Sequence, residues 1–249
     1  MRIYVISLQT SQSRRAEIEA QMRSVGLDYE LFDAIDPRQG LRFFMGYREK
    51  EFLISTGREA SPEEVACYAS HLCLWRQSIE INEPILIMED DAHLIKESFV
   101  SALRKTFLWI GEYGFIRLQT EGPRKPIRKV MVERAAGFDL YYCRSYPYGS
   151  MCYAIAPRVA RTFVEASRML TGPVDLFIKR FWIHRQPLFS LSPPGVTGSD
   201  LERESTIAGR DERQRNVGLR WQRVIDRLHT AVNRARFNRA YLSTHSRNP

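Results

Sequence analysis

The sequence predicts an α/β domain, in which helices flank a central, mostly parallel sheet, followed by a basic helical tail. Along residues 1–200, apolar strand-like stretches alternate with amphipathic helical ones, the pattern of a layered α/β fold. Residues 201–249 differ in charge, because they hold eleven Arg and five acidic residues and so carry +6 of the net +8. We therefore expect a domain over 1–200 and a basic amphipathic helical tail over 201–249.

The bulk composition fits an ordinary globular protein. The chain has 249 residues, and 44% are hydrophobic, which is enough for a sizeable core. Its longest apolar runs are far below the roughly 18 residues that cross a bilayer, and the apolar core of "MRIYVISL" is too short for a signal peptide. We therefore expect a cytoplasmic protein. Its four cysteines lack the close paired spacing of a zinc site, so we expect buried free thiols.

The first third reads as strand, helix, strand and a long capped helix. "RIYVISL" (residues 2–8) is typical of a buried strand, and the amphipathic segment 13–25 ends at Gly26. "YELFDAID" predicts a second strand. In "SPEEVACYASHLCLWRQSIE", Ser61 at the N-cap, Pro62 at the first helical position and Glu64 form a capping box. A helix from residue 62 to about 80 follows from this signal.

The remaining body continues the alternation. A strand over Ile85–Met88 precedes a helix over 98–110 and the strand "GFIRLQT". Residues 121–150 are rich in Gly, Pro, Tyr and Arg and predict an irregular or hairpin-like segment. "GSMCYAIAP" is a strand that Pro157 ends, a helix over 159–170 follows, and "PLFSLSPPGV" supplies the last strand and loop.

Three consecutive carboxylates, Glu89, Asp90 and Asp91, follow the buried strand in "EPILIMEDDAHL". Adjacent anions repel and are costly to bury, so water or a cation must compensate them. Continued strand alternation would put Glu89 and Asp91 on one side and Asp90 on the other. Open α/β sheets place ligands at this carboxyl end of their strands. A solvated loop or a cap on the following helix is the structural alternative.

Two carboxylates at a strand end suit Mg²⁺ or Mn²⁺, which take one or two protein carboxylates and fill their shell with water and substrate phosphates. Such an ion would link Asp91 and Glu89 to a diphosphate and stabilise charge on a departing phosphate. Phosphatases and nucleotidyltransferases use the same pattern, so it does not by itself select one reaction.

Several blocks together resemble glycosyltransferase family 25, which includes bacterial lipooligosaccharide β-galactosyltransferases and collagen galactosyltransferases. They begin with "VISLQTSQSRR" and "YELFDAID" and are strongest in "SPEEVACYASHLCLWRQSIE" running into "PILIMEDDAHL". "GSMCYAIAP", "GPVDLF", "PLFSLSPPGV" and "ESTI" follow in the family's order, so the resemblance spans residues 3–207.

The resemblance implies a GT-A-like nucleotide-sugar fold and inverting transfer of a hexose, most often galactose from UDP-galactose, to a glycan acceptor such as lipopolysaccharide. It implies that Glu89, Asp90 and Asp91 form a DxD-like site for the metal and UDP, with Asp91 acting in catalysis. Mn²⁺ is the expected ion, and Mg²⁺ is possible.

Further candidates lie outside the acidic run. Inverting transfer needs a base, for which we expect Asp175 after "TGPV", where a helix cap is an equal alternative. Arg14 follows a strand-to-helix turn and could meet a diphosphate, as could its neighbour Arg15. Ser7 and His71 complete the expected donor-binding set, although a core imidazole is at least as good an explanation for His71.

The tail predicts an interfacial helix. Trp221, Ile225 and Leu228 would face acyl chains, and Arg220, Arg223, Arg227 and Arg234 would meet anionic head groups. A helix packed on the domain with a solvated arginine face, or an oligomer contact, would explain the same pattern.

Two other functions stay open on sequence grounds. A metal-dependent nucleotidyltransferase or phosphotransferase could use the same carboxylates, although there is no P-loop or Gly-rich phosphate fingerprint. A catalytically inactive relative or a basic binding protein would account for the tail, but no nucleic-acid-binding motif is present, and the positive charge is confined to the tail.

Overall fold

The fold is taken from a computed structural model, which describes residues 1–39, 46–121, 128–146, 149–198 and 217–245. The strands are β1 (Arg2–Ser7), β2 (Glu30–Asp33), β3 (Gly46–Tyr47), β4 (Ile85–Glu89), β5 (Ala92–Leu94), β6 (Phe115–Arg117), β7 (Lys129–Ala135), β8 (Phe138–Cys143), β9 (Cys152–Ile155), β10 (Met169–Leu170), β11 (Phe189–Ser192) and β12 (Val196–Gly198). The helices are α1 (Gln12–Val25), α2 (Glu49–Thr56), α3 (Pro62–Ile81), α4 (Phe99–Tyr113), α5 (Pro157–Ala166), α6 (Val174–Lys179), α7 (Phe181–His184) and α8 (Val217–His245), with a 3-10 turn at Pro37–Gln39.

The centre of the molecule is an eight-stranded sheet in the order β2-β1-β4-β9-β6-β11-β8-β7. The pairs β1–β2, β1–β4 and β6–β11 are parallel, whereas β9 and β8 run antiparallel to both of their neighbours. The other six strands therefore share one direction. The expected α/β architecture is confirmed, with a sheet that is mixed at β9 and β8.

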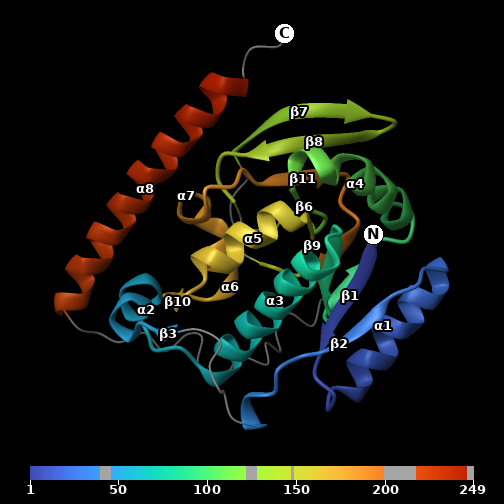
Figure 1. Cartoon of the computed structure of the whole chain (residues 1–249), viewed down its shortest axis with the longest axis horizontal. Helices are drawn as coiled ribbons and strands as arrows, with labels where there is room; N and C mark the ends of the chain where they lie inside the picture. Colours follow the sequence, from blue (N-terminus) through green and yellow to red (C-terminus); the bar gives the residue numbers. More distant parts are fainter. Residues whose placement is uncertain (40–45, 122–127, 147–148, 199–216, 246–249) are drawn as a thin grey trace.

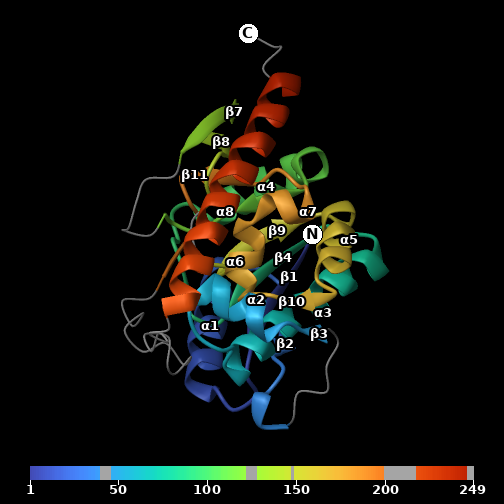
Figure 2. The same cartoon turned by 90° about the vertical axis from the view of Figure 1, so that its left-hand side faces the viewer.

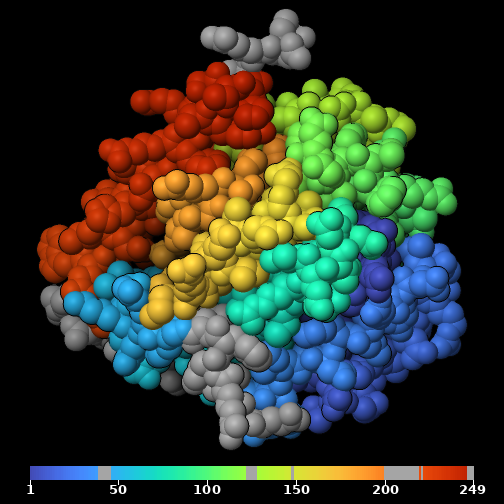
Figure 3. All heavy atoms as spheres, viewed as in Figure 1, coloured from blue at the N-terminus to red at the C-terminus, as the bar shows by residue number. Residues whose placement is uncertain are grey.

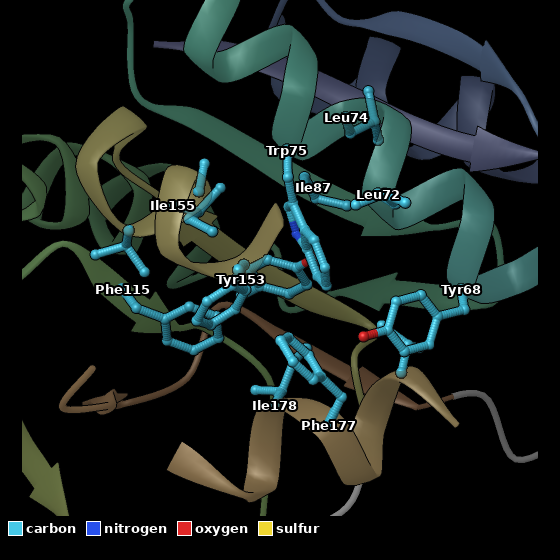
Figure 4. Packing of buried hydrophobic residues seen from close by; sticks show 14 of the residues in the cluster. Tyr68, Leu72, Leu74, Trp75, Ile87, Phe115, Tyr153, Ile155, Phe177 and Ile178 are labelled. Carbon is cyan, nitrogen blue, oxygen red and sulfur yellow. The ribbon is translucent and has the colours of Figure 1, made fainter. Parts of the chain in front are cut away.

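Helices cover both faces of the sheet, so the core has two halves. On one face α3 and α5 lie side by side, with α6 and α7 next to them (Figure 1). The buried rings of Trp75, Phe163 and Phe177 pack against one another there. Trp75 also lies beside Tyr153 of β9 (Figure 4). On the other face α1 and α4 bury Ile18, Phe99 and similar residues against the alternate side chains of the same strands. Burial of both faces explains the continuous apolar runs of β1 and β4.

The capped helix predicted from sequence forms as expected. Ser61 accepts the backbone N–H of Glu64, the Glu64 carboxylate accepts the N–H of Ser61, and Pro62 is at the first helical position. Glu64 also receives both ends of the Arg58 guanidinium at 2.5 Å each. The start of α3 is therefore fixed by a buried ion pair as well as by its cap.

Three expectations need adjustment. The helix expected over 159–170 begins at Pro157 and ends at Ala166, because Met169–Leu170 pairs with β3 as strand β10. The segment 121–150, expected to be irregular or hairpin-like, contains a regular hairpin of β7 and β8 that extends the main sheet. The expectation of buried thiols is right for Cys143 and Cys152, whereas Cys67 and Cys73 are partly exposed.

Helix α8 runs along one flank of the molecule, beside α2 and α7 (Figures 2 and 3). Its C-terminal half docks through Phe237 on Phe181 and Tyr241 stacked on Tyr142. Buried Asn238 accepts the Tyr142 hydroxyl at 2.7 Å and donates to the Arg144 carbonyl at 2.9 Å. These contacts set the rotation of the helix.

That rotation leaves apolar side chains of the N-terminal half of α8 facing outward. Trp221 is 69% exposed and Leu228 is 61% exposed, with Val224, Ile225 and Val232 also exposed. Arg223, Arg227 and Arg234 instead line a cavity between α8 and the body. The side chain of Arg220 lies outside the described residues. Arg227 is nonetheless exposed, and Arg223 and Arg234 are half-buried. The expectation that these side chains meet anionic head groups stays a prediction. Over the described ranges, no helix is long and apolar enough to span a membrane.

Candidate functional site

The acidic cluster lies where two neighbouring parallel strands end. β1 pairs with β4 so that Ile6 is opposite Glu89, and the backbone N–H of Asp90 donates to the carbonyl of Ile6 at 3.1 Å. β4 ends at Glu89, and Asp90 and Asp91 form a turn before β5. Because Asp91 lies in this turn, strand alternation does not set the direction of its side chain, contrary to the expectation from the sequence. The carboxylates do lie at the carboxyl edge of the sheet, where ligands of α/β folds bind.

Asp90 is held by the first strand and helix. Ser7 Oγ donates to its Oδ2 at 2.7 Å, and Arg14 Nη1 lies 3.3 Å from its Oδ1. Arg15 takes another direction, since its guanidinium donates to the carbonyls of Ser7 and Leu8 and to Asp33 at 2.6–3.0 Å. Arg14 thus belongs to the acidic site, whereas Arg15 fastens the ends of β1 and β2.

Glu89 is held from the opposite side by α3 and β9. Its Oε1 accepts the Ser150 hydroxyl at 2.6 Å and lies 3.3 Å from His71 Nε2. The other ring nitrogen of His71 is 2.8 Å from the Tyr153 hydroxyl. Trp75 Nε1 donates to the same oxygen at 2.9 Å, and Figure 4 shows these two side chains next to each other. A chain of hydrogen bonds therefore joins the buried core to the acidic cluster.

These hydrogen bonds favour one tautomer of His71. Trp75 can only donate, so the single hydroxyl proton of Tyr153 is available for His71 Nδ1. His71 then carries its proton on Nε2 and donates it to Glu89. The opposite tautomer would turn a nitrogen lone pair toward a carboxylate, which is unfavourable. His71, fully buried, is therefore both a core imidazole and a direct neighbour of the site.

Asp91 is the member of the cluster that lacks compensation. Its Oδ1 is buried and has no hydrogen-bond partner among the described residues. Burial, followed by the charges of Glu89 and Asp90, raises the pKa of Asp91 to about 7, and Arg14 offsets only part of this effect. Three carboxylates with one nearby arginine leave an excess of negative charge. A buried carboxylate oxygen in such a field fits a cation.

The oxygen donors of Asp91 and Glu89 are of the hard type that Mn²⁺ and Mg²⁺ prefer. A second set overlaps with this one, because Cys67 Sγ, a ring nitrogen of His71 and a carboxylate oxygen of Glu89 lie within 4.8 Å of one another. That mixed set suits a softer ion such as Zn²⁺. The two sets share Glu89 and can be distinguished by replacing Cys67.

Asp175, the expected base, lies elsewhere. It is the second residue of α6, whose N-cap is Pro173, and its Oδ1 accepts the N–H of Leu176 at 2.7 Å. It lines the cavity beside α8, together with Glu64 at the start of α3. Glu64 and His71 are seven residues apart on one helix, so this lining residue of the cavity lies about 10 Å along the axis of α3 from His71, the neighbour of Glu89. The structure thus groups Ser7, Arg14, His71, Glu89, Asp90 and Asp91, and separates Asp175 from them.

Ser150 and Tyr153 are the site-supporting residues that the sequence did not identify. Both lie in "GSMCYAIAP", which reads only as a strand and its approach. The sequence signals for such a role were the hydroxyl of Ser150 after Gly149 and the presence of Tyr153 in an otherwise apolar strand. Their roles depend on pairing of β9 with β4, where Met88 lies opposite Cys152.

Comparison with known proteins adds an independent observation. The sequence profile of glycosyltransferase family 25, described as LPS biosynthesis protein, matches residues 1–178 and so covers both the acidic cluster and the helix that supports it. The chain belongs to glycosyltransferase family 25. The family is thus established from more than half of the chain.

Similar proteins include glycosyltransferases of lacto-N-neotetraose biosynthesis. A lacto-N-neotetraose biosynthesis glycosyltransferase, LgtE of Neisseria meningitidis, is 26% identical over 92% of this chain and 90% of its own length. LgtB of Neisseria gonorrhoeae is 37% identical over 72% of this chain and 66% of its own. A procollagen galactosyltransferase of Xenopus laevis is 24% identical over 71% of this chain and 30% of its own. Among solved structures, a UDP-glucose pyrophosphorylase aligns with a TM-score of 0.42 and 11% identity, over 78% of this chain and 91% of that one.

Proposed function

We propose that this family 25 enzyme is a divalent-cation-dependent, inverting hexosyltransferase that uses UDP-galactose and a lipopolysaccharide-type glycan acceptor. The glycosyltransferase activity follows from the family, and the donor, acceptor and cation are the proposed part. Galactose is the first choice because a similar protein is named a galactosyltransferase. A lipopolysaccharide-type glycan acceptor is the first choice because the family description names LPS biosynthesis, and the Neisseria relatives are named for biosynthesis of another glycan, lacto-N-neotetraose.

The observation that carries the proposal is the buried, unpartnered Oδ1 of Asp91 beside two more carboxylates. Asp91 and Glu89 would hold the cation. When bound, Mn²⁺ or Mg²⁺ supplies positive charge that offsets the diphosphate and stabilises UDP as the leaving group. Ser7 and Arg14 hold Asp90 in place, and Ser150 and His71 do the same for Glu89.

Asp175 remains the proposed general base. An acceptor hydroxyl would have to reach its carboxylate, which lines the cavity beside α8. Loss of a general base typically lowers the rate by 10²–10⁴-fold. Asp175→Asn should therefore lower kcat by that factor while leaving UDP affinity unchanged. A purely structural Asp175 would instead give a small effect on kcat that parallels any loss of thermal stability.

The exposed apolar stripe of α8 supports association with a membrane surface. Trp221, Ile225 and Leu228 are each at least half exposed. Apolar side chains presented on a helix with many arginines are typical of an interfacial helix. The double variant Trp221→Ser, Leu228→Ser should lose cosedimentation with vesicles that contain anionic lipid. Unchanged cosedimentation would contradict membrane binding through this stripe.

Transfer assays test the reaction itself. The protein is incubated with UDP-galactose, UDP-glucose or UDP-N-acetylhexosamines and a truncated lipooligosaccharide, with Mn²⁺ or with a chelator. We expect UDP release and a β-linked product only with the cation, and fastest with UDP-galactose. A faster reaction with another donor would overturn the assignment of galactose as the transferred sugar. Undiminished turnover in chelator would overturn the proposed dependence on a divalent cation.

Cys67→Ser locates the cation. If Asp91 and Glu89 hold the cation, Mn²⁺ still activates the Cys67→Ser variant, whereas it no longer activates Asp91→Asn. The reverse result would place the metal at Cys67, His71 and Glu89 instead.

A further inference from the structure

A cavity of about 580 Å³ separates the N-terminal half of α8 from α2, α6 and the start of α3. Its volume lies in the range of small-molecule binding sites. It is distinct from the acidic cluster, since none of Glu89, Asp90 and Asp91 lines it. The body supplies one wall, and Arg223, Asp226, Arg227, Thr230 and Arg234 of α8 supply the other.

The lining is strongly cationic. It holds six basic side chains and the three acidic side chains Glu64, Asp175 and Asp226, which gives a net charge of +3. Two acids are engaged locally, because Glu64 pairs with Arg58 at 2.5 Å and Asp226 with Arg180 at 2.7 Å. Lys179, Arg223, Arg227 and Arg234 line the same cavity as Asp175, the third acid.

The positions of these cations are set by the fold. Arg223 packs against Gly57, where an added Cβ would come within 2.5 Å of its guanidinium, and Arg223 Nη2 lies 3.5 Å from the carbonyl of Thr56. Arg180 holds Asp226 and so ties α7 to α8. Burial, opposed by Asp175 and aided by Arg234 and Arg180, lowers the pKa of Lys179 to about 8. The cavity is therefore a preorganised cationic site that an anion would stabilise.

We propose that this cavity binds a phosphate-bearing group separate from the donor nucleotide, carried by a phosphorylated saccharide or by a lipid head group. Arginine side chains recognise phosphate through paired N–H donors, and several of them converge here. The volume exceeds what a lone inorganic phosphate needs, so the ligand includes the moiety that carries the phosphate. The inference concerns a second site and does not require the proposed donor to be correct.

The test compares two double variants that remove the same charge from α8. Arg227→Gln, Arg234→Gln alters the cavity lining, whereas Arg236→Gln, Arg239→Gln alters exposed residues outside it. Binding of inorganic phosphate, glucose 6-phosphate and dihexanoyl phosphatidic acid is measured by calorimetry in chelator, with UDP and Mn²⁺ titrated separately. Thr230→Glu provides a third variant, which adds a negative charge to the cavity without removing an ion pair.

We expect the cavity double variant and Thr230→Glu to weaken binding of the tightest phosphate probe at least tenfold, and the control double variant to change it less than twofold. UDP binding should stay unchanged in all three. Tighter binding of glucose 6-phosphate than of the lipid identifies a saccharide source, and the reverse order identifies a head group. Equal phosphate binding in the two double variants overturns the proposal. Loss of UDP binding in the cavity variant also overturns it, because the cavity would then belong to the donor site.

Discussion

The Tyr153 hydroxyl lies 2.8 Å from Nδ1 of His71, although 82 positions separate the two residues in the chain. This contact connects β9 to α3 and, through His71, to Glu89 of the acidic cluster. It makes the orientation of a site carboxylate depend on a buried tyrosine that cannot itself reach a substrate, since Tyr153 is 0% exposed.

Tyr153→Phe should lower activity by loosening Glu89. The change leaves the Trp75 N–H and His71 Nδ1 without their partner, which costs about 1–3 kcal/mol of folding free energy for each buried group. We expect kcat to fall roughly tenfold, about 1.4 kcal/mol in the barrier, with little change in the KM for the acceptor. Steady-state kinetics and thermal unfolding provide both readouts.

Tyr68→Phe is the matched control, because the buried Tyr68 hydroxyl bonds to Ser167 at 2.9 Å and not to the chain that reaches Glu89. It should lose stability but keep kcat. If both variants lose activity in proportion to stability, Tyr153 has no positioning role.

Asp91 should make the cation-free protein less stable as pH rises. Its folded-state pKa of about 7 exceeds the unfolded value of 3.8, so the native state binds the extra proton, and stability falls between about pH 4 and pH 7. In chelator, Asp91→Asn should be more stable than the parent at pH 8 by roughly 2–4 kcal/mol and nearly equal to it at pH 4. Denaturant unfolding at several pH values measures the difference, and parallel pH profiles for the two proteins would refute it.

Arg14→Gln and Arg15→Gln should differ in effect although the residues are neighbours. Arg14 lies 3.3 Å from Asp90, so its loss should weaken binding of UDP with Mn²⁺ about tenfold. Arg15 bonds to two strand carbonyls and Asp33, so its loss should cost stability and leave UDP affinity within about twofold. Calorimetry and thermal unfolding separate the two effects. Equal losses of UDP affinity would contradict this division of roles.

Asn238→Ala should release α8 from the body. The change leaves the Tyr142 hydroxyl and the Arg144 carbonyl without a partner and should cost about 1–3 kcal/mol. Amide hydrogen exchange should speed up along α8 and little elsewhere. Asn233→Ala, at an exposed position of the same helix, is the control and should leave exchange unchanged. Similar exchange in both variants would show that Asn238 does not hold the helix.

Local signals predicted much of the fold. The capping box at Ser61 and Glu64, the end of α1 at Gly26 and the apolar run of β4 each depend on residues close in sequence, and each forms as expected. Sequence reasoning was less successful where the outcome depends on long-range pairing. The hairpin of β7 and β8 is stable because β8 pairs with β11, about 50 residues later. A single sequence carries no direct sign of that partner.

In the candidate site, too, the features set by nearby residues were predictable, and those set by long-range pairing were not. The acidic run and Arg14 were visible as charged residues near strand ends, but the link from Glu89 through His71 to Tyr153 required the sheet order β4-β9. The direction of the α8 arginines also followed from docking of Phe237 and Tyr241 and not from the helical pattern, which fixes which residues share a face but not which face is buried.

Calorimetric titration with UDP, with and without Mn²⁺, tests the central claim most directly. It is made on the parent protein, on Asp91→Asn and on Asp139→Asn, a control acid that pairs with Arg134 on the β8 hairpin. The account predicts cation-dependent UDP binding in the parent and in Asp139→Asn, and its loss in Asp91→Asn. Equal UDP affinity in all three proteins, whether or not Mn²⁺ is added, would contradict the assignment of the acidic cluster as the donor site.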